Sequence, residues 1–105
     1  MYNKEAMSEL KKLLMKKFPN LIDKIILYGS RAEDRESEYS DYDILLILKQ
    51  DYDWKQEKAL KLLSYDINID YDILTDINII SKNELSSVKG NMPFIQEAIS
   101  KGLVL

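Results

Sequence analysis

The sequence contains neither cysteine nor histidine. Without cysteine, the chain can form no disulfide and no thiolate metal site. Without histidine, it lacks the commonest general base and the commonest protein ligand of transition metals. Any catalysis must therefore depend on carboxylates, hydroxyls, lysine or arginine. Any bound metal is expected to be a hard, oxygen-liganded ion such as magnesium.

Long apolar runs are also missing. The longest are Ile44 to Leu48 and Ile25 to Tyr28, whereas a membrane-spanning helix needs about 20 apolar residues. The first ten residues are polar and charged and hold no signal-peptide core. We therefore expect a cytoplasmic protein without membrane contact.

An excess of positive charge is absent too. The net charge is −3 and the pI is near 5.0, whereas proteins that bind long nucleic acids through phosphates usually present a basic surface. The lysines at 11, 12, 16 and 17 are accordingly interpreted as the solvated face of a helix. A long nucleic acid is not the expected partner, although a single nucleotide remains compatible with this charge.

What is present is the composition of an ordinary globular chain: 105 residues, 46% hydrophobic and 31% charged. That length predicts one domain over residues 1–105. Periodicity, capping residues and turn residues predict elements in the order α-β-(α)-β-α-β-α-β. The expected elements are a helix from Asn3 to Pro19, strands at 24–28, 40–48 and 73–80, a short helical turn within 31–39, helices at about 54–65, from Ser81 and from Pro93, and a final strand at 103–105. The expected fold class is α/β (α+β), a small mixed sheet of three or four strands flanked by helices.

The first candidate for chemistry is Gly29-Ser30, which follows an apolar strand and precedes the short helical turn. A glycine backbone can approach a phosphate closely, serine adds a hydroxyl, and the N–H groups that follow can point at an anion. Taken alone, such a pair is more often an ordinary turn.

The second candidate is Asp41-Tyr42-Asp43, which opens the strand at 40–48. Residues two apart on a strand point to the same face, so the two carboxylates would lie about 6–7 Å apart at Cα. Their repulsion can be relieved by a bound cation or a shared proton. The alternative is that both acids lie at a solvated strand end. The apolar run from Ile44 to Leu48 follows immediately, however, and makes a purely solvent-exposed position of the acids less natural.

Together the two candidates resemble the signature of the nucleotidyltransferases related to DNA polymerase beta, in particular the minimal nucleotidyltransferases. The matching segments are LeuTyrGlySerArgAla at 27–32, ten residues between Ser30 and Asp41, and SerAspTyrAspIleLeuLeu at 40–46. The ending from Asn91 to Leu105 is similar to the family's closing helix, with Lys101 where the family has glutamate before glycine. The resemblance covers the whole chain and implies the polymerase beta-like nucleotidyltransferase fold.

The resemblance also implies a site. Asp41 and Asp43 would bind two magnesium ions that bridge the triphosphate of ATP or another nucleoside triphosphate, while Gly29 and Ser30 would hold its β- and γ-phosphates. Arg31 would either add charge near these phosphates or form a surface salt bridge with neighbouring acids.

A third carboxylate, as metal ligand and proton acceptor, completes the site in many relatives. Asp70, Asp72 and Asp76 are the candidates, and similarity of the strand 75–80 to the family's third-acid strand favours Asp76. Relatives with a Tyr-Asp-hydrophobic-Leu segment, like 71–74 here, often have serine in that place, so the third acid can also be absent.

The resemblance implies transfer of a nucleoside monophosphate, most simply AMP from ATP, to an acceptor hydroxyl. Minimal members pair with a helical HEPN protein in toxin–antitoxin modules, where the nucleotidyltransferase is the antitoxin and can adenylylate a tyrosine of the toxin. Two alternatives stay open: a degenerate partner that neutralises a toxin by binding alone, and a small-molecule (antibiotic) nucleotidyltransferase. The apolar faces of the first and last helices could also support a homodimer.

Overall fold

The computed structural model describes residues 2–33 and 41–105. Its centre is a four-stranded mixed sheet in the order β3-β2-β1-β4. The strands are β1 (Ile22–Tyr28), β2 (Tyr42–Leu48), β3 (Thr75–Ser81) and β4 (Leu103–Val104). β1 pairs antiparallel with β2 and with β4, whereas β2 and β3 are parallel. The predicted mixed α/β sheet of three or four strands is confirmed.

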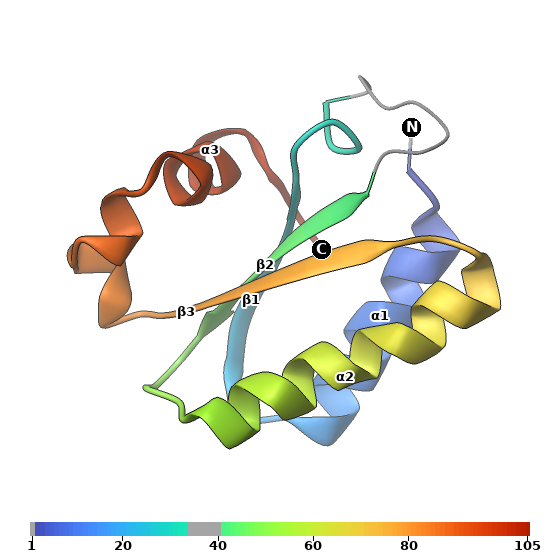
Figure 1. Cartoon of the computed structure of the whole chain (residues 1–105), viewed down its shortest axis with the longest axis horizontal. Helices are drawn as coiled ribbons and strands as arrows, with labels where there is room; N and C mark the ends of the chain where they lie inside the picture. Colours follow the sequence, from blue (N-terminus) through green and yellow to red (C-terminus); the bar gives the residue numbers. More distant parts are fainter. Residues whose placement is uncertain (1, 34–40) are drawn as a thin grey trace.

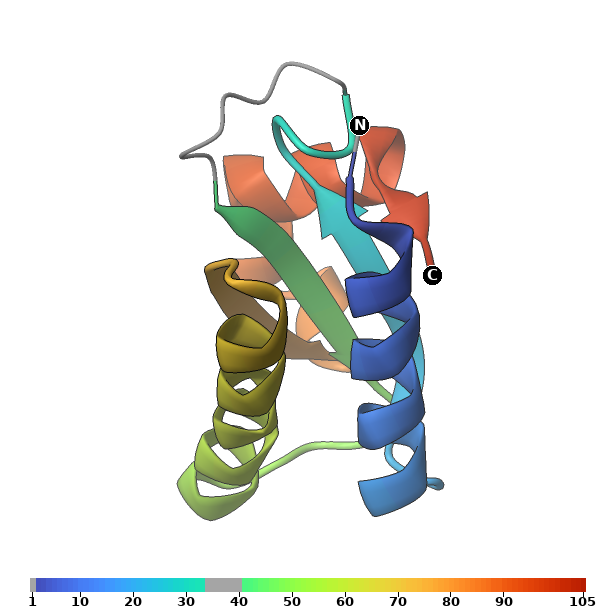
Figure 2. The same cartoon turned by 90° about the vertical axis from the view of Figure 1, so that its right-hand side faces the viewer.

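Three α-helices cover this sheet: α1 (Lys4–Lys17), α2 (Trp54–Tyr71) and α3 (Pro93–Lys101). Figures 1 and 2 show α1 and α2 side by side on one face of the sheet and α3 on the other. Two single 3₁₀ turns, η1 (Glu84–Ser86) and η2 (Lys89–Asn91), lead from β3 to α3. α2 is the crossover that a parallel β2–β3 pair requires. Within the described part of the chain, no helix is both long enough and apolar enough to span a bilayer.

The helix starts follow the capping residues seen in the sequence. The Asn3 side chain accepts a hydrogen bond from the Ala6 N–H at 3.0 Å. Asp53 and Gln56 form a reciprocal capping box at the start of α2. Such caps satisfy backbone donors that have no partner inside the helix. Ser81, from which a helix was expected, exchanges hydrogen bonds with Glu84, although the element that begins there is a 3₁₀ turn rather than an α-helix.

α2 is longer than the predicted 54–65. It continues to Tyr71 through residues 66–71, whose alternating apolar and polar side chains leave the type of element open in the sequence. Ile67 is buried in the core, which gives the extension its own apolar anchor. Asp72 ends the helix in the left-handed conformation, with φ of 52°. The hydroxyl of Thr75 then donates to the Asn68 side chain at 2.9 Å, so β3 begins two residues later than expected.

Strand alternation divides the core into two parts. One part packs α1 and α2 against one face of the sheet and includes Leu27, Ile44 and Leu46. The other packs α3 against the opposite face through Ile95 and Ala98. The buried side chains of α1 and α3 thus pack on the chain's own sheet, while Ile99 of α3 stays 48% exposed. A homodimer through these helices stays a prediction.

Candidate active site

Three side chains form a row across the sheet where β1 ends and β2 and β3 begin. Tyr28 pairs with Asp43, and Asp43 pairs with Asp76 in the neighbouring parallel strand. Neighbouring strands of a sheet lie about 4.7–4.9 Å apart. Tyr28 packs in the core part under α3, so the row lies on that face. The two aspartates are distant in sequence and adjacent in space.

Asp41 lies just outside β2 and is exposed, two residues before Asp43. By alternation, it shares the Asp43 side of the strand. Tyr42 points the opposite way: it is buried in the core under α1 and α2, and its hydroxyl accepts a hydrogen bond from the Asn3 N–H at 2.8 Å. The arrangement expected from the sequence, with the acids on one side and Tyr42 packed on the other, is present.

Two features of position 29 require glycine: its backbone conformation and its close contact with Asp43. Its φ is +76°, a conformation that residues with a side chain rarely adopt. A Cβ at this position would lie 2.5 Å from Oδ2 of Asp43. The Gly29 carbonyl also accepts hydrogen bonds from the N–H groups of Ala32 and Glu33, both at 3.2 Å. Gly29 therefore lets a tight turn press its backbone against the Asp43 carboxylate.

That turn also carries Ser30 and Arg31, both half-buried. The Arg31 guanidinium lies 4.5 Å from the centroid of the Tyr42 ring, a cation–π contact. Tyr42 faces away from the carboxylate row, so this contact holds Arg31 beside the row rather than in it. The rest of the predicted helical turn, residues 34–39, and Ser40 of the motif lie outside the described residues.

The row makes Asp43 electrostatically unusual. Burial raises the pKa of its carboxyl above the ordinary value, and the charges of Asp76, Asp41 and Glu97 raise it further. Asp43 thus lies among three other carboxylates, which concentrates negative charge at this place. Such a site favours a cation or a proton.

Glu97 of α3 is the member of this group that sequence reasoning missed. It lies between the buried residues Ile95 and Ala98 on the edge of the helix that faces the sheet, and it is half-buried. Helical periodicity marks it as a boundary residue of the apolar face. No sequence signal could show which strands that edge would overlie.

Tyr28 and Asn78 were also missed. The Asn78 side-chain amide donates to the Tyr28 hydroxyl at 3.1 Å. Burial raises the pKa of Tyr28 to about 12; the Asn78 hydrogen bond opposes this rise, while Asp43, Asp76 and Glu97 add to it. The phenol therefore stays neutral at physiological pH. The signal available was alternation, because Asn78 follows Asp76 by two residues and shares its side of β3.

The remaining candidates for a third acid lie elsewhere. Asp70 is exposed on α2, and Asp72 is the exposed residue that caps it. Of the three acids weighed from the sequence, only Asp76 stands in register with Asp43. Its role as third carboxylate stays a prediction, which this position supports.

The donor set of the row fits a hard divalent cation, because carboxylate oxygens are the ligands that magnesium prefers and a cation would relieve their repulsion. The carboxylates of the row do not, however, form a complete metal-binding site. Among residues 2–33 and 41–105, no three acidic side chains are gathered closely enough to hold a metal ion by themselves. Oxygen atoms from a bound substrate would have to complete such a site.

Comparison with known proteins identifies the family of this chain. Residues 8–105 match the family described as polymerase beta, nucleotidyltransferase. The chain belongs to this nucleotidyltransferase family. The nucleotidyltransferase predicted from the Gly-Ser and Asp-x-Asp motifs is therefore confirmed, as is the polymerase beta-like fold.

Two curated relatives of this nucleotidyltransferase come from Methanocaldococcus jannaschii. One, described as a candidate protein adenylyltransferase (MJ0604), is 32% identical over 105 residues, which is 100% of this chain and 99% of the relative. The other, described in the same words (MJ0141), is 28% identical over 99 residues and covers 94% of each chain.

Solved structures share the fold of this nucleotidyltransferase. A toxin–antitoxin crystal structure with AMP-PNP aligns with a TM-score of 0.63 at 21% identity, covering 98% of this chain and 72% of that chain. A tri-AMPylated HEPN toxin of Shewanella oneidensis in complex with its MNT antitoxin aligns at 0.58 and 20% identity, covering 96% and 69%. At these identities, the structures show the fold alone.

Proposed function

We propose that this nucleotidyltransferase transfers AMP from ATP to a hydroxyl group of a protein, a tyrosine of a HEPN-type toxin, and acts as that toxin's antitoxin. The observation that carries the proposal is the row of Asp43 and Asp76 in adjacent parallel strands, with the Gly29 turn pressed against Asp43. This brings a candidate phosphate-binding turn and paired carboxylates to one edge of one sheet.

The choice of substrate and partner draws on the relatives. Both curated relatives are described as candidate protein adenylyltransferases. Among the proteins that share the fold, one toxin–antitoxin complex holds AMP-PNP, and another contains an AMPylated HEPN toxin with its MNT antitoxin. An ATP substrate and a helical HEPN partner are the simplest interpretation of these likenesses for the present chain.

In this proposal, the Gly29 turn and the Ser30 hydroxyl hold the β- and γ-phosphates. Asp41, Asp43 and Asp76 would bind magnesium, which supplies charge neutralisation along the triphosphate and acidifies a bound hydroxyl when present. Asp76 accepts the proton of the acceptor hydroxyl. Arg31, steadied on the Tyr42 ring, adds positive charge at the mouth of the site. AMP joins the acceptor oxygen, and pyrophosphate leaves.

The first experiment is calorimetric titration of ATP in the presence and absence of magnesium. The wild type is expected to bind only with magnesium, and Asp41→Asn/Asp43→Asn is expected to lose that binding. The matched control is Asp70→Asn/Asp72→Asn, which removes the same charge from exposed positions outside the row. Equal loss of binding in both double variants, or no binding by the well-folded wild type, would refute the site.

A binding-only antitoxin remains the competing function, since no three carboxylates form a ready-made metal cage among the described residues. The two functions differ in pyrophosphate release. We expect release when ATP, magnesium and the cognate helical partner are combined with the wild type. Neutralisation of the partner without any release or AMP adduct by mass spectrometry would establish binding alone.

A further inference from the structure

The outward face of α2 carries large apolar side chains that the core does not use. Trp54 is 69% exposed, Leu62 48%, Tyr65 56% and Ile69 79%. Their spacing places them on one side of the helix, opposite the buried Leu60, Ser64 and Ile67. Soluble chains scatter single exposed apolar residues, but a continuous stripe marks an interaction surface.

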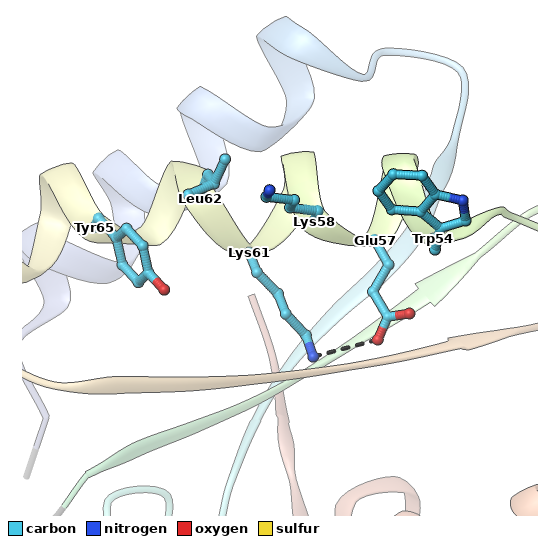
Figure 3. A pocket seen from close by; sticks show the side chains of 6 residues that line it. All are labelled: Trp54, Glu57, Lys58, Lys61, Leu62 and Tyr65. Atoms are coloured by element: carbon cyan, nitrogen blue, oxygen red, sulfur yellow. Dashed lines mark ion pairs between the residues drawn. The ribbon is translucent and has the colours of Figure 1, made fainter.

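Figure 3 shows the first two-thirds of this stripe, with Trp54, Lys58, Leu62 and Tyr65 projecting from α2 around a shallow groove. The groove has a volume of about 280 Å³. Glu57 and Lys61 form its border and pair with each other at 3.2 Å. All residues that line the groove belong to α2, so a partner that fills it contacts this helix.

The two halves of α2 carry opposite net charge. Its first half, 54–62, holds three lysines (Lys55, Lys58, Lys61) and one glutamate, whereas its second half, 63–71, holds two aspartates (Asp66, Asp70) and no basic residue. A helix dipole favours acidic residues near its start and basic residues near its end. Asp53 and Glu57 suit the dipole at the start of α2, whereas Asp70 opposes it in the last turn. In net charge, each half of α2 is complementary to the other half.

We propose that α2 is a self-association surface on which a second copy of this chain packs with its own α2 antiparallel. In that arrangement, the lysine half of one helix faces the aspartate half of the other, and the two dipoles oppose each other. A two-fold axis near Leu62 brings Trp54 of one copy towards Ile69 of the other, and Lys58 towards Tyr65. One self-complementary patch then serves both copies, as a two-fold dimer requires.

The expected dimer is weak. α2 has 18 residues, so the seam is about 27 Å long at 1.5 Å per residue. A single helix pair lies at the small end of specific interfaces, where association is transient. Because α2 covers the sheet face opposite α3, the dimer leaves the carboxylate row open, and this inference does not depend on the proposed catalytic function.

The first test is sedimentation equilibrium of the full chain from about 1 µM to 1 mM, the range expected for a weak interface. The mass should rise from 12.3 kDa towards twice that value. Trp54→Ala should weaken association about tenfold or more, since aromatic anchors dominate such interfaces. A mass that stays at the monomer value at 1 mM would refute the proposal and leave the stripe to another partner.

Charge exchange tests the antiparallel arrangement. Lys58→Glu and Asp66→Lys should each weaken association about tenfold, and the double variant should restore it to within about threefold of wild type. A purely local role of these charges predicts otherwise: each variant would leave the mass of the chain in solution unchanged. Additive weakening in the double variant would exclude the antiparallel register.

The absence of cysteine makes a third test specific. Leu62→Cys would be the only thiol in the chain and would meet its copy near the two-fold axis. A short bis-maleimide should therefore give a covalent dimer. Val88→Cys is the control, because Val88 is 86% exposed outside α2. Equal cross-linking of the two variants would mean random collision and would overturn the proposed axis.

Discussion

The two faces of the sheet differ in how far their apolar side chains extend. The face under α1 and α2 is apolar along most of its length, with Leu27 from β1, Ile44 from β2 and Ile77 from β3 all buried. The face under α3 is apolar only in part. Beyond Leu45 and Ile80 it gives way to Asn78, Asp43 and Asp76.

This difference follows from strand alternation and helix coverage. Ile44 and Asp43 are neighbours in the chain but project to opposite faces. Two helices cover the first face, whereas the short α3 covers only part of the second. The same strands can therefore hold the fold together on one side and leave polar groups accessible on the other. Variants of neighbouring residues should separate stability from function.

The largest expected effect is on the packed face. Ile44→Ala should lower the free energy of unfolding by about 2–5 kcal/mol, because Ile44 is fully buried and the alanine would leave a cavity. Urea denaturation measures the change. If the molecules that stay folded still bind ATP with wild-type affinity, the two faces are separable; parallel loss of affinity would show that they are coupled.

The next effect is on the open face. Asp76→Asn should slow AMP transfer about a hundredfold or more, since a positioned proton acceptor contributes at least that much. Because Asp76 is also a proposed magnesium ligand, ATP binding should weaken as well, while the melting temperature stays close to wild type. The assay is pyrophosphate release with the helical partner, beside ATP calorimetry. Unchanged release would remove Asp76 from the mechanism and return the third acid to Asp70, Asp72 or none.

Gly29→Ala should disturb both properties at once. The left-handed backbone costs a residue with a side chain about 1–2 kcal/mol, and the new Cβ would push against the Asp43 carboxylate. We expect the free energy of unfolding to fall by about 2 kcal/mol and ATP affinity to fall with it. Lower stability with intact affinity would mean that the turn does not hold the phosphates.

The smallest expected effect is a gain in stability rather than a loss. Asp43→Asn should raise the melting temperature at pH 7 by about 2–4 °C, although it abolishes binding. Because folding raises the pKa of Asp43, the ionised carboxylate costs stability, and this cost appears as pH rises from below the unfolded-state pKa through the raised folded value. The advantage of asparagine should vanish at acidic pH, where Asp43 is protonated. A pH-independent difference measured by thermal scans would contradict this electrostatic origin.

Most of the fold and the catalytic motifs could be predicted from the sequence because each rests on local rules. The caps at Asn3 and Asp53, the stop at Pro19 and the turn at Gly29 each depend on nearby residues alone. The pairing of Asp43 with Asp76 came from resemblance rather than spacing, since the register of parallel strands depends on how the crossover helix packs.

The errors also have physical causes. Residues 66–71 alternate apolar and polar side chains like a strand, yet they continue α2, because Ile67 finds a place in the core and Asp72 provides the helix end. Glu97 could not be assigned to the site, because its role depends on where α3 crosses the sheet. Tertiary packing decides both, and a local pattern does not contain it.

The central position of β2 has a consequence for hydrogen exchange. β2 is bonded to β1 on one side and to β3 on the other, whereas the two-residue β4 lies at the edge of the sheet. Amides in such a central strand exchange only in large, near-global openings, while edge amides exchange by fraying. The carboxylate of Asp43 is partly accessible, whereas its backbone belongs to the strand whose amides we expect to exchange most slowly in the protein. The side chain that we propose contacts the substrate therefore belongs to the strand that unfolds last.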